Sequence, residues 1–583
     1  MSSSLNAEHF PGNCQPFTAL KLVSGKTAWI SPDFCFPPKV EGRARTAEDV
    51  FFETYGYMIE GGQLFDNLVF DRSRSAEFKA ERYGGRGIGD NGGGVRCGIL
   101  GGHQVKGLGK NVLVGAGADV HHSYGGFKAL YAVHEAIFSK VYRKIMPFGA
   151  ADVYGVILTG PDAAYHSKLQ RGWGALLVRE DVLRPAGFIR APHYRQRVAG
   201  MTSDVARVRR ANKELLKYCG GVGGYTQFLG RFLANCANQF AFGRIARIMH
   251  GSLTPSNLCM DGRWLDLTNS GFVGSAENNA GGNRQTSSFY EEMHFPLRVT
   301  AEMMHTFAKY NGVSLNPAPL IDFYNKELGM RLKSHLCYLF GWTYELYREE
   351  LDADFSRLSQ TVMRILSSGK VAYDRWPEHL GADDPVLIFL ERMYCARDHA
   401  EDTAAGTGAV GDQERAAFDV LMHAAYLTRS RIGESFDSFF IASFLLAFKR
   451  CAYSEFFFKT RLERQISPML VDDLKAEDIR DFIDGCLGIS EWVFGEPVES
   501  ATITLFRSKA IEIRYDRSHQ SFSIIKTDST KTLRSAPDAL AAIARECAAN
   551  PGVFILYGYD FAKFLIRMMS GIPPTGAKQR AYA

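Results

Sequence analysis

The sequence lacks the signatures of a secreted, membrane-spanning or zinc-binding protein. Its 11 cysteines are scattered and odd in number, and none forms a CxxC pair, so neither a disulfide framework nor a zinc site is indicated. The first residues contain no basic segment followed by an apolar stretch, as a signal peptide would. The strongest apolar run, Ser438 to Phe448, ends at Lys449, whereas a membrane span needs about 20 residues. We therefore expect a cytoplasmic protein without a membrane span, in which this run is a buried helix.

The chain also has little excess charge. Its 68 Lys and Arg residues against 63 Asp and Glu residues give +5 over 583 residues, which is too weak a field to indicate nucleic acid as the main partner. Hydrophobic residues (46%) and charged residues (22%) occur in ordinary globular proportions. The length allows roughly four domains, or one large catalytic unit with additions.

Glycine is distributed unevenly, with 16 of the 57 glycines between residues 82 and 126. Closely spaced glycines let backbone N–H groups converge on phosphate oxygens, and arginines add bidentate charge. The sequence ERYGGRGIGDNGGGVRCG from Glu81 therefore makes a candidate nucleotide-binding segment, with a flexible loop carrying solvated arginines as the alternative. The candidate binding residues here are Gly85, Arg86, Gly93, Gly94 and Arg96.

Apolar patterns around the glycines predict a sheet crossed by one helix. Short strand-like runs occur at 104–106, 112–114 and 153–158, and apolar residues at helical spacing predict a helix over 127–146 that Pro147 ends. Helical patterns dominate after residue 203, and strand-like runs return after about residue 490. We expect three parts: residues 1–160 with the sheet and its helix, a mainly helical part over 161–490, and an appended α+β module over 491–583.

Two further patterns carry candidate chemistry. Lys106, on a predicted strand, precedes Glu135, on the predicted helix, by 29 residues, and a strand lysine held by a helix glutamate aims an ammonium at nucleotide phosphates in kinase-type folds. Asn257 and Asp266 flank a hairpin turn at Asp261 and Gly262, and an amide oxygen and a carboxylate so placed can share Mg²⁺ when phosphate supplies other ligands. The alternatives are unrelated surface charges for the first pair and ordinary turn-forming residues for the second.

Six segments occur in the order found in the selenoprotein-O-like protein adenylyltransferases, which the chain resembles over about residues 15 to 300. They are PFTALKLVSGKTAWIS from Pro16, RYGGRGIGDNGGGVRCG from Arg82, HQVKGLGKN from His103, HEAIFSKVY from His134, GALLVREDVLRPAGF from Gly174 and HGSLTPSNLCMDGRWLDLTNSGF from His250. The resemblance implies an α+β, protein-kinase-like two-lobed fold that binds ATP in reversed orientation and transfers AMP.

The resemblance also implies roles for individual residues. Lys106 and Glu135 would form the phosphate-orienting ion pair, and Asn257 and Asp266 would hold Mg²⁺. Arg179 and Arg184 would bind the terminal phosphate. The two arginines are separated by two fewer residues than in the family pattern, which puts Arg184 in more doubt than Arg179.

One departure bears on the reaction. Ser256 stands where the family has an acidic residue before the metal-binding asparagine, and a neutral hydroxyl cannot accept a proton as an aspartate can. Either the protein is a catalytically silent ATP-binding pseudokinase that acts as a scaffold or partner subunit, or its acceptor needs no base because it is already an ionised carboxylate. Retention of the other site residues favours AMP transfer to a protein or peptide acceptor. The chain is also similar to the large maturation proteins of siderophore-conjugated microcins, where a peptide C-terminus is activated.

Overall fold

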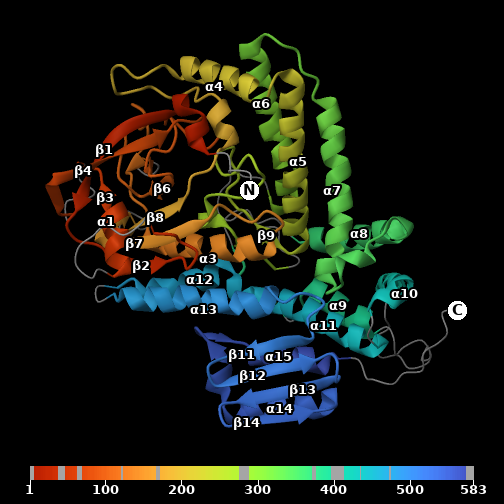
Figure 1. The fold of residues 1–583 in the computed structure, drawn as a ribbon. Coiled ribbons are helices and arrows are strands. Elements are labelled where there is room, and N and C mark those ends of the chain that lie inside the picture. The colour runs from red at the N-terminus through yellow and green to blue at the C-terminus, as the bar shows by residue number, and fades with distance from the viewer. Residues whose placement is uncertain are drawn as a thin grey trace.

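The computed structural model describes residues 6–36, 46–61, 68–119, 123–165, 171–274, 288–369, 376–381, 383–395, 412–432, 435–471 and 474–572. The chain is a mixture of helices and strands with one large antiparallel sheet, so the predicted α+β class is confirmed. The strands of this sheet gather in the N-terminal part, long helices follow beside it, and a second sheet with its own helices lies in the C-terminal part (Figure 1).

The large sheet has eight antiparallel strands in the order β2-β7-β8-β6-β5-β4-β1-β3. They are β1 (Cys14–Leu22), β2 (Lys26–Ile30), β3 (Tyr57–Met58), β4 (Phe70–Glu81), β5 (Cys97–Leu100), β6 (His103–Lys106), β7 (Val153–Tyr165) and β8 (Arg171–Glu180). The predicted strands at 104–106 and 153–158 are confirmed as parts of β6 and β7. The boundary predicted at residue 160 lies inside β7, because the hairpin of β7 and β8 continues the sheet to Glu180.

The strand predicted at 112–114 is wrong, because this segment forms a turn. The side-chain oxygen of Asn111 accepts a hydrogen bond from the backbone N–H of Leu113 (2.9 Å), and its amide group donates to the carbonyls of Gly94 and Cys97 (2.6 and 2.9 Å). A side chain that bonds its own backbone two residues on competes with strand pairing.

The helix predicted over 127–146 is confirmed as α3 (Ala129–Ile145), which packs on β7 and β8. Its apolar residues at helical spacing, including Val133, Ile137 and Val141, are fully buried. On its other side α3 contacts α12 (Lys459–Ile466) and α13 (Ala476–Phe494), which run below it in Figure 1. The helix that carries Glu135 is therefore covered on two sides.

Helices dominate from residue 204 to 494, as predicted. They include α4 (Asp204–Tyr218), α5 (Val222–Ile245), α6 (Phe295–Asn311), α7 (Ala318–Leu339), α8 (Asp352–Ser367), α9 (Pro385–Cys395), α10 (Asp412–Ile432) and α11 (Phe436–Ala452), with α1 (Ala47–Tyr55) preceding them in the N-terminal part. The apolar run from Ser438 to Phe448 lies in α11 and is buried. Within the described ranges, no helix combines the length and the apolar character that crossing a membrane requires.

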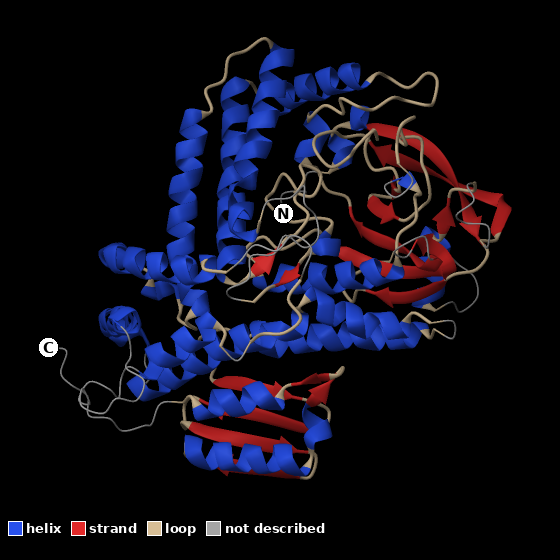
Figure 2. Ribbon diagram, turned by 180° about the vertical axis from the view of Figure 1, so that it is seen from behind, coloured by secondary structure: helices blue, strands red, loops and turns tan. Residues whose placement is uncertain are grey.

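The C-terminal strands and helix are also confirmed. Figure 2 shows them as a separate sheet with helices against it. The sheet is the meander β11 (Thr502–Arg507), β12 (Ile511–Asp516), β13 (Ser521–Lys526) and β14 (Ser529–Leu533), accompanied by α14 (Ala536–Ala549), the short pair β15 (Ile555–Leu556) and β16 (Tyr559–Asp560), and α15 (Ala562–Ser570). The boundary predicted at 490 lies inside α13. The ring of Phe506 on β11 packs 6.0 Å from Trp492 of α13, so this sheet shares the core of the helical part.

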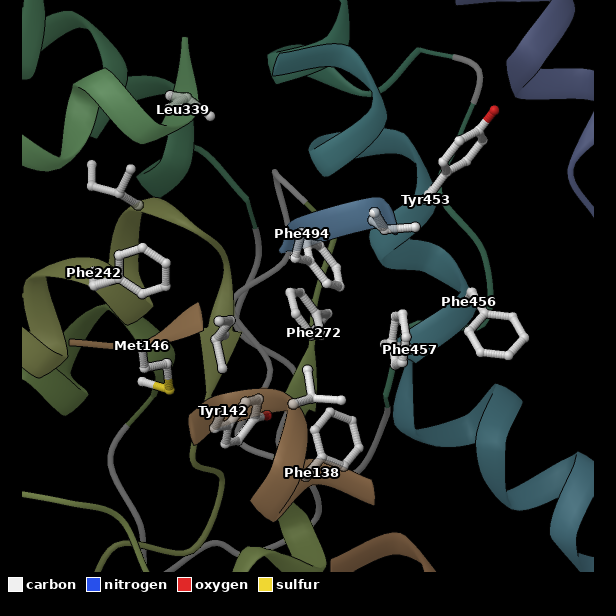
Figure 3. Packing of buried hydrophobic residues seen from close by; sticks show 14 of the residues in the cluster. Phe138, Tyr142, Met146, Phe242, Phe272, Leu339, Tyr453, Phe456, Phe457 and Phe494 are labelled. Carbon is white, nitrogen blue, oxygen red and sulfur yellow. The ribbon is translucent and has the colours of Figure 1, made fainter. Parts of the chain in front are cut away.

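A cluster of aromatic rings joins α3 to the C-terminal helices (Figure 3). Phe272, on β10 (Gly271–Phe272), stacks on Phe494 at the end of α13, with ring centroids 5.1 Å apart and planes 4° from parallel. Phe457 packs 5.9 Å from Phe272, and Phe138 of α3 packs 6.5 Å from it. β10 pairs with β9 (Ile248–Met249), and these two strands bracket the loop that contains Asn257 and Asp266. The cluster therefore supports both α3 and this loop.

Candidate functional site

Lys106 lies between two carboxylates that come from distant parts of the chain. Its ammonium is 3.0 Å from Glu135 Oε2 and also forms an ion pair with Asp266 Oδ1. The side chains of Lys106 and Glu135 are 1% and 2% exposed, whereas that of Asp266 is 25% exposed. The structure thus brings together the strand lysine, the helix glutamate and the hairpin aspartate that the sequence singled out separately.

The two predicted phosphate-binding arginines lie beside this group. Arg179, on β8, pairs with Glu135 through its Nη1, and Arg184 Nε lies 3.2 Å from Glu81 Oε2. Both guanidinium groups also donate to the side-chain oxygen of Gln104, Arg179 at 2.9 and 2.7 Å and Arg184 at 2.8 Å. Both arginines are buried, and each already has an acidic partner inside the protein.

The local sheet register explains why these side chains meet. Gln104 faces Arg179 directly across the β6–β8 ladder, and Lys106 is two residues further along β6. Alternate residues of a strand point to the same face, so Gln104 and Lys106 share one face of the sheet. α3 packs on this sheet and delivers Glu135 to it.

The hairpin predicted around Asp261 and Gly262 is present. Gly262 has φ +90°, and Cys259 N donates to Arg263 O (2.9 Å) across the turn. Leu265 N donates to Asn257 O (3.0 Å), which aligns the two arms. Asn257 and Asp266 therefore flank the turn as the sequence predicts, with Asp266 one residue beyond the last paired position.

The side chain of Asn257 is oriented by its neighbours. Its amide nitrogen donates to Ser252 O (2.7 Å), which directs the Oδ1 atom away from that carbonyl. Oδ1 accepts a hydrogen bond from Ser256 Oγ at 3.3 Å and keeps further acceptor capacity, because a carbonyl oxygen has two lone pairs. An amide oxygen fixed in this way is a suitable ligand for a hard cation.

Asp266 combines an uncommon backbone conformation with a strongly ionised carboxyl. Its φ of 62° and ψ of 64° place it in the left-handed region, which costs a non-glycine residue roughly 1 kcal/mol or more and is found often at functional sites. Burial opposes ionisation of its carboxyl, but the charges of Lys106, Arg179 and Arg96 outweigh burial and hold the pKa well below its usual range. The carboxylate is therefore charged at neutral pH.

The glycine-rich segment approaches other parts of the protein closely. A Cβ on Gly93 (φ +145°) would lie 2.3 Å from the carbonyl oxygen of Glu81, and one on Gly85 (φ +90°) would lie 3.0 Å from the ring of Pro255. At Gly94 a Cβ would meet only ordinary contacts, the nearest at 3.5 Å. Gly93 is therefore required by packing within the chain, and Gly85 lies in tight contact with the segment that leads into Asn257.

The two predicted arginines of this segment differ in their surroundings. Arg86 is exposed, whereas Arg96 is partly buried, donates to Gly126 O at 3.3 Å and lies 5.2 Å from the ring centroid of Phe127. The ammonium of Lys106 lies 4.3 Å from the same ring centroid. Arg96 therefore lies near Lys106, at the same ring, and its charge contributes to lowering the pKa of Asp266. Among the described residues, no hydrogen bond or ion pair joins Arg86 to this group.

Sequence reasoning missed Gln104 and Glu81. Gln104 is 1% exposed and Glu81 is 3% exposed, and together they bind both arginines. Burial is the main cause that raises the pKa of Glu81, against the opposing charge of Arg184. Gln104 could have been found from the strand pattern. It lies two residues before Lys106, and alternate residues of a strand point to the same face.

The central group contains three cations and three acidic residues: Lys106, Arg179, Arg184, Glu81, Glu135 and Asp266. In the described ranges, no three His, Cys, Asp or Glu side chains come together in a way that could hold a metal ion. A cation at Asp266 and Asn257 would therefore need ligands from a bound molecule, as the sequence predicts. A comparison of the sequence with family models finds no match, and a comparison with curated proteins finds no significant one.

Proposed function

We propose that this protein is an ATP- and Mg²⁺-dependent transferase that moves AMP onto a carboxylate of a protein or peptide acceptor, within a protein-kinase-like fold. The observation that carries the proposal is the position of Lys106 between Glu135 and Asp266. Kinase-type folds use a strand lysine held by a helix glutamate to bind phosphates, and an aspartate to bind the metal. The antiparallel sheet with α3 packed on it, followed by a helical part, is consistent with such a fold.

The residues present fit a magnesium ion. Asp266 is ionised and its side chain is the most exposed of the acidic groups around Lys106, while the Asn257 oxygen is oriented by Ser252 and Ser256. Mg²⁺ is commonly held by one or two protein oxygens together with substrate phosphates. Once bound, it would neutralise phosphate charge, which is the chemistry that phosphoryl and nucleotidyl transfer need from a metal.

The residues around Asp266 also fit phosphate groups. Binding of a cation to Asp266 competes with its ion pair to Lys106, and the freed ammonium would remain held by Glu135 at 3.0 Å. Lys106 then offers its charge to the phosphates, and the partly buried Arg96, which lies at the same Phe127 ring, adds a second positive charge. Arg179 and Arg184 bind acidic partners in this state, so they would contact a terminal phosphate only after exchanging part of those contacts.

The chain's own residues limit the acceptor chemistry. The Ser256 hydroxyl lies 2.8 Å from Thr254 Oγ1 and donates to Asn257 Oδ1, and a neutral hydroxyl is no general base. A carboxylate acceptor needs none, because it is ionised at neutral pH. In the proposed reaction a carboxylate oxygen forms a bond to the α-phosphorus, the bond from that phosphorus to the bridging oxygen breaks, and pyrophosphate leaves with the electron pair.

The same serine favours one alternative, a catalytically silent protein that binds ATP and acts as a scaffold or partner subunit. Labelled ATP distinguishes the two. Purified protein with Mg²⁺ and a peptide acceptor should release pyrophosphate, and the acceptor should carry label from the α-phosphate and none from the γ-phosphate. Hydroxylamine added afterwards should convert the acyl-adenylate into an acyl hydroxamate and release the label as AMP. ATP binding without pyrophosphate release would support the silent alternative, and transfer of γ-label would contradict both.

A further inference from the structure

The positive charge of this chain is concentrated in one segment. Residues 190 to 217 contain eight basic and two acidic residues, an excess of six charges, whereas the whole chain carries +5. The segment comprises the connection after Arg190 and nearly all of α4 (Figure 1). The remainder of the chain is therefore close to neutral, and any electrostatic attraction of an anionic partner would be local.

Most of these cations face solvent, and we call them the α4 basic surface: Arg195, Arg197, Arg209, Arg210, Lys213 and Lys217. Among the described residues none of the six forms an ion pair with a carboxylate. The acidic residue Asp204 is already shared by Arg190 and Arg207, at 3.2 and 2.8 Å. Like charges spaced three or four residues apart on a helix repel one another, so the surface gains from any anion that binds it.

A buried guanidinium adds to this positive field. Arg82 is 2% exposed, and within the described part of the chain its Nε and Nη2 atoms have no hydrogen-bond partner. Its carbonyl accepts a hydrogen bond from Arg207 of α4, so it lies directly beneath that helix. Burial first, and then the charge of Arg207, lower the pKa of Arg82.

The α4 basic surface is connected to the candidate site through few residues. Gly85 N donates to Arg190 O at 2.9 Å, and a Cβ on Gly85 would lie 3.0 Å from the ring of Pro255, two residues before Asn257. Further along, Ala116 N donates to Arg195 O at 3.0 Å. The connection after Arg190 therefore lies along the glycine-rich segment, between α4 and the residues proposed to bind the nucleotide.

We infer that the α4 basic surface binds an acidic segment of the peptide or protein acceptor and so presents the acceptor to the candidate site. That the bound peptide is the acceptor rests on the proposed function. That it is acidic rests only on the positive charges of the α4 basic surface. α4 is about 22 Å long, which matches about seven residues of extended peptide. Exposed apolar side chains, Val198, Val205 and Tyr218, lie among the cations and suit a peptide that mixes acidic and apolar residues.

The test uses the full chain and a short fluorescent peptide rich in glutamate with interspersed valine. Arg209→Gln, Lys213→Gln and Lys217→Gln are combined in one variant, because all three side chains are exposed. We expect the dissociation constant of the peptide to rise about tenfold in this variant, since each exposed charge pair contributes modestly. Binding to the unchanged protein should also weaken with added salt, because exposed charges are screened over about 10 Å at 0.1 M.

A matched variant removes the same net charge elsewhere. It combines three substitutions on other helices, Lys326→Gln on α7, Arg364→Gln on α8 and Arg545→Gln on α14. The three native side chains are exposed and form no ion pair within the described ranges. This variant should bind the peptide as the unchanged protein does. A peptide in which glutamine replaces glutamate should bind neither protein.

Three results would overturn the inference: equal peptide affinity in the α4 variant and the unchanged protein, equal loss of affinity in both variants, or tighter binding of oligothymidylate of the same net charge than of the peptide.

Mg²⁺–ATP binding is measured in parallel by calorimetry. If ATP does not bind the unchanged protein while peptide binding still depends on α4, the proposed function fails and the basic surface stands. If ATP binds both proteins equally and the peptide does not distinguish them, the surface fails and the proposed function stands.

Discussion

Gln104 accepts two hydrogen bonds from the guanidinium of Arg179, its direct neighbour across the β6–β8 ladder, at 2.9 and 2.7 Å. The same oxygen accepts a third hydrogen bond, from Arg184 at 2.8 Å. A single neutral side chain thus fixes the spacing of two buried cations. Glu135 and Glu81 neutralise these cations, and Gln104 orients them.

The first prediction concerns this oxygen. Gln104→Met keeps the size of the side chain and leaves parts of two buried guanidinium groups without an acceptor, so the free energy of unfolding should fall by about 2–4 kcal/mol. Urea unfolding of the variant and the unchanged protein measures this difference in the free energy of unfolding. Gln15→Met on β1 of the same sheet is the control, because Gln15 is only partly buried, and it should cost less than about 0.5 kcal/mol. Equal costs would show that Gln104 does not hold the arginines.

The second prediction concerns Asp266. Asp266→Asn keeps the shape of the side chain and removes the negative charge proposed to bind Mg²⁺, so the rate of pyrophosphate release should fall roughly 100-fold or more. Asp261→Asn, on the turn of the same hairpin, is the control and should retain the rate, because Asp261 pairs with Arg263 on the outer side of the turn. Near-normal turnover in Asp266→Asn would refute the site assignment.

The third prediction separates two kinds of glycine in the glycine-rich segment. At Gly93 an added Cβ would lie 2.3 Å from the Glu81 carbonyl oxygen, whereas at Gly89, also at positive φ, it would meet no atom within 4 Å. Gly93→Ala should therefore destabilise the protein by about 3 kcal/mol or more, and Gly89→Ala by about 1 kcal/mol. Thermal and urea unfolding of both variants check the difference, and equal losses would contradict the close approach.

The fourth prediction concerns pH. Burial lowers the pKa of His250 to about 4, while its Nε2–H donates to the carbonyls of Leu265 (3.1 Å) and Asn257 (3.3 Å) on the two arms of the hairpin. The unfolded chain binds a proton on this histidine below about pH 6.5, and the folded chain does so only below about pH 4. Stability from His250 is therefore present above pH 6.5 and falls as the pH is lowered to 4, by about 3 kcal/mol.

His250→Gln removes this titration, so the slope of unfolding free energy against pH between 7 and 4 should be shallower in the variant. Other buried groups, such as His335, titrate in both proteins and cancel in the comparison. Identical slopes would mean that His250 is not buried as a neutral group.

The sequence predicted those parts of the structure that local patterns determine. Helical spacing gave α3 within two residues at its start and one at its end, and the apolar run gave α11 as a buried helix. The hairpin at Asp261 and Gly262 follows from its turn residues. Local patterns failed at 112–114, where the side chain of Asn111 forms a turn despite the strand-forming valines around it.

The sequence indicated several residues of the candidate site, but it did not indicate how most of them contact one another. Spacing indicated Lys106 and Glu135 as partners, but nothing in the sequence showed that Asp266 would bind the same ammonium. That contact depends on how the hairpin packs on the sheet, which is a long-range property. The glycines were expected to approach a ligand, whereas Gly93 is needed to approach the chain's own backbone. Glycine content alone cannot distinguish a glycine that lets a ligand approach the backbone from one that lets two backbone segments of the chain approach each other.

The stack of Phe272 on Phe494 joins the loop that carries Asn257 and Asp266 to the C-terminal helices. Phe272 follows Asp266 by six residues, and Phe494 ends α13. A partner that displaced α13 would displace β10 with it. If this changed the affinity of Asp266 for a ligand, that ligand would change the affinity for the partner by the same factor. For the same reason, a chain shortened before α13 would lose the support of the loop that carries Asn257 and Asp266, although every residue of that loop would remain.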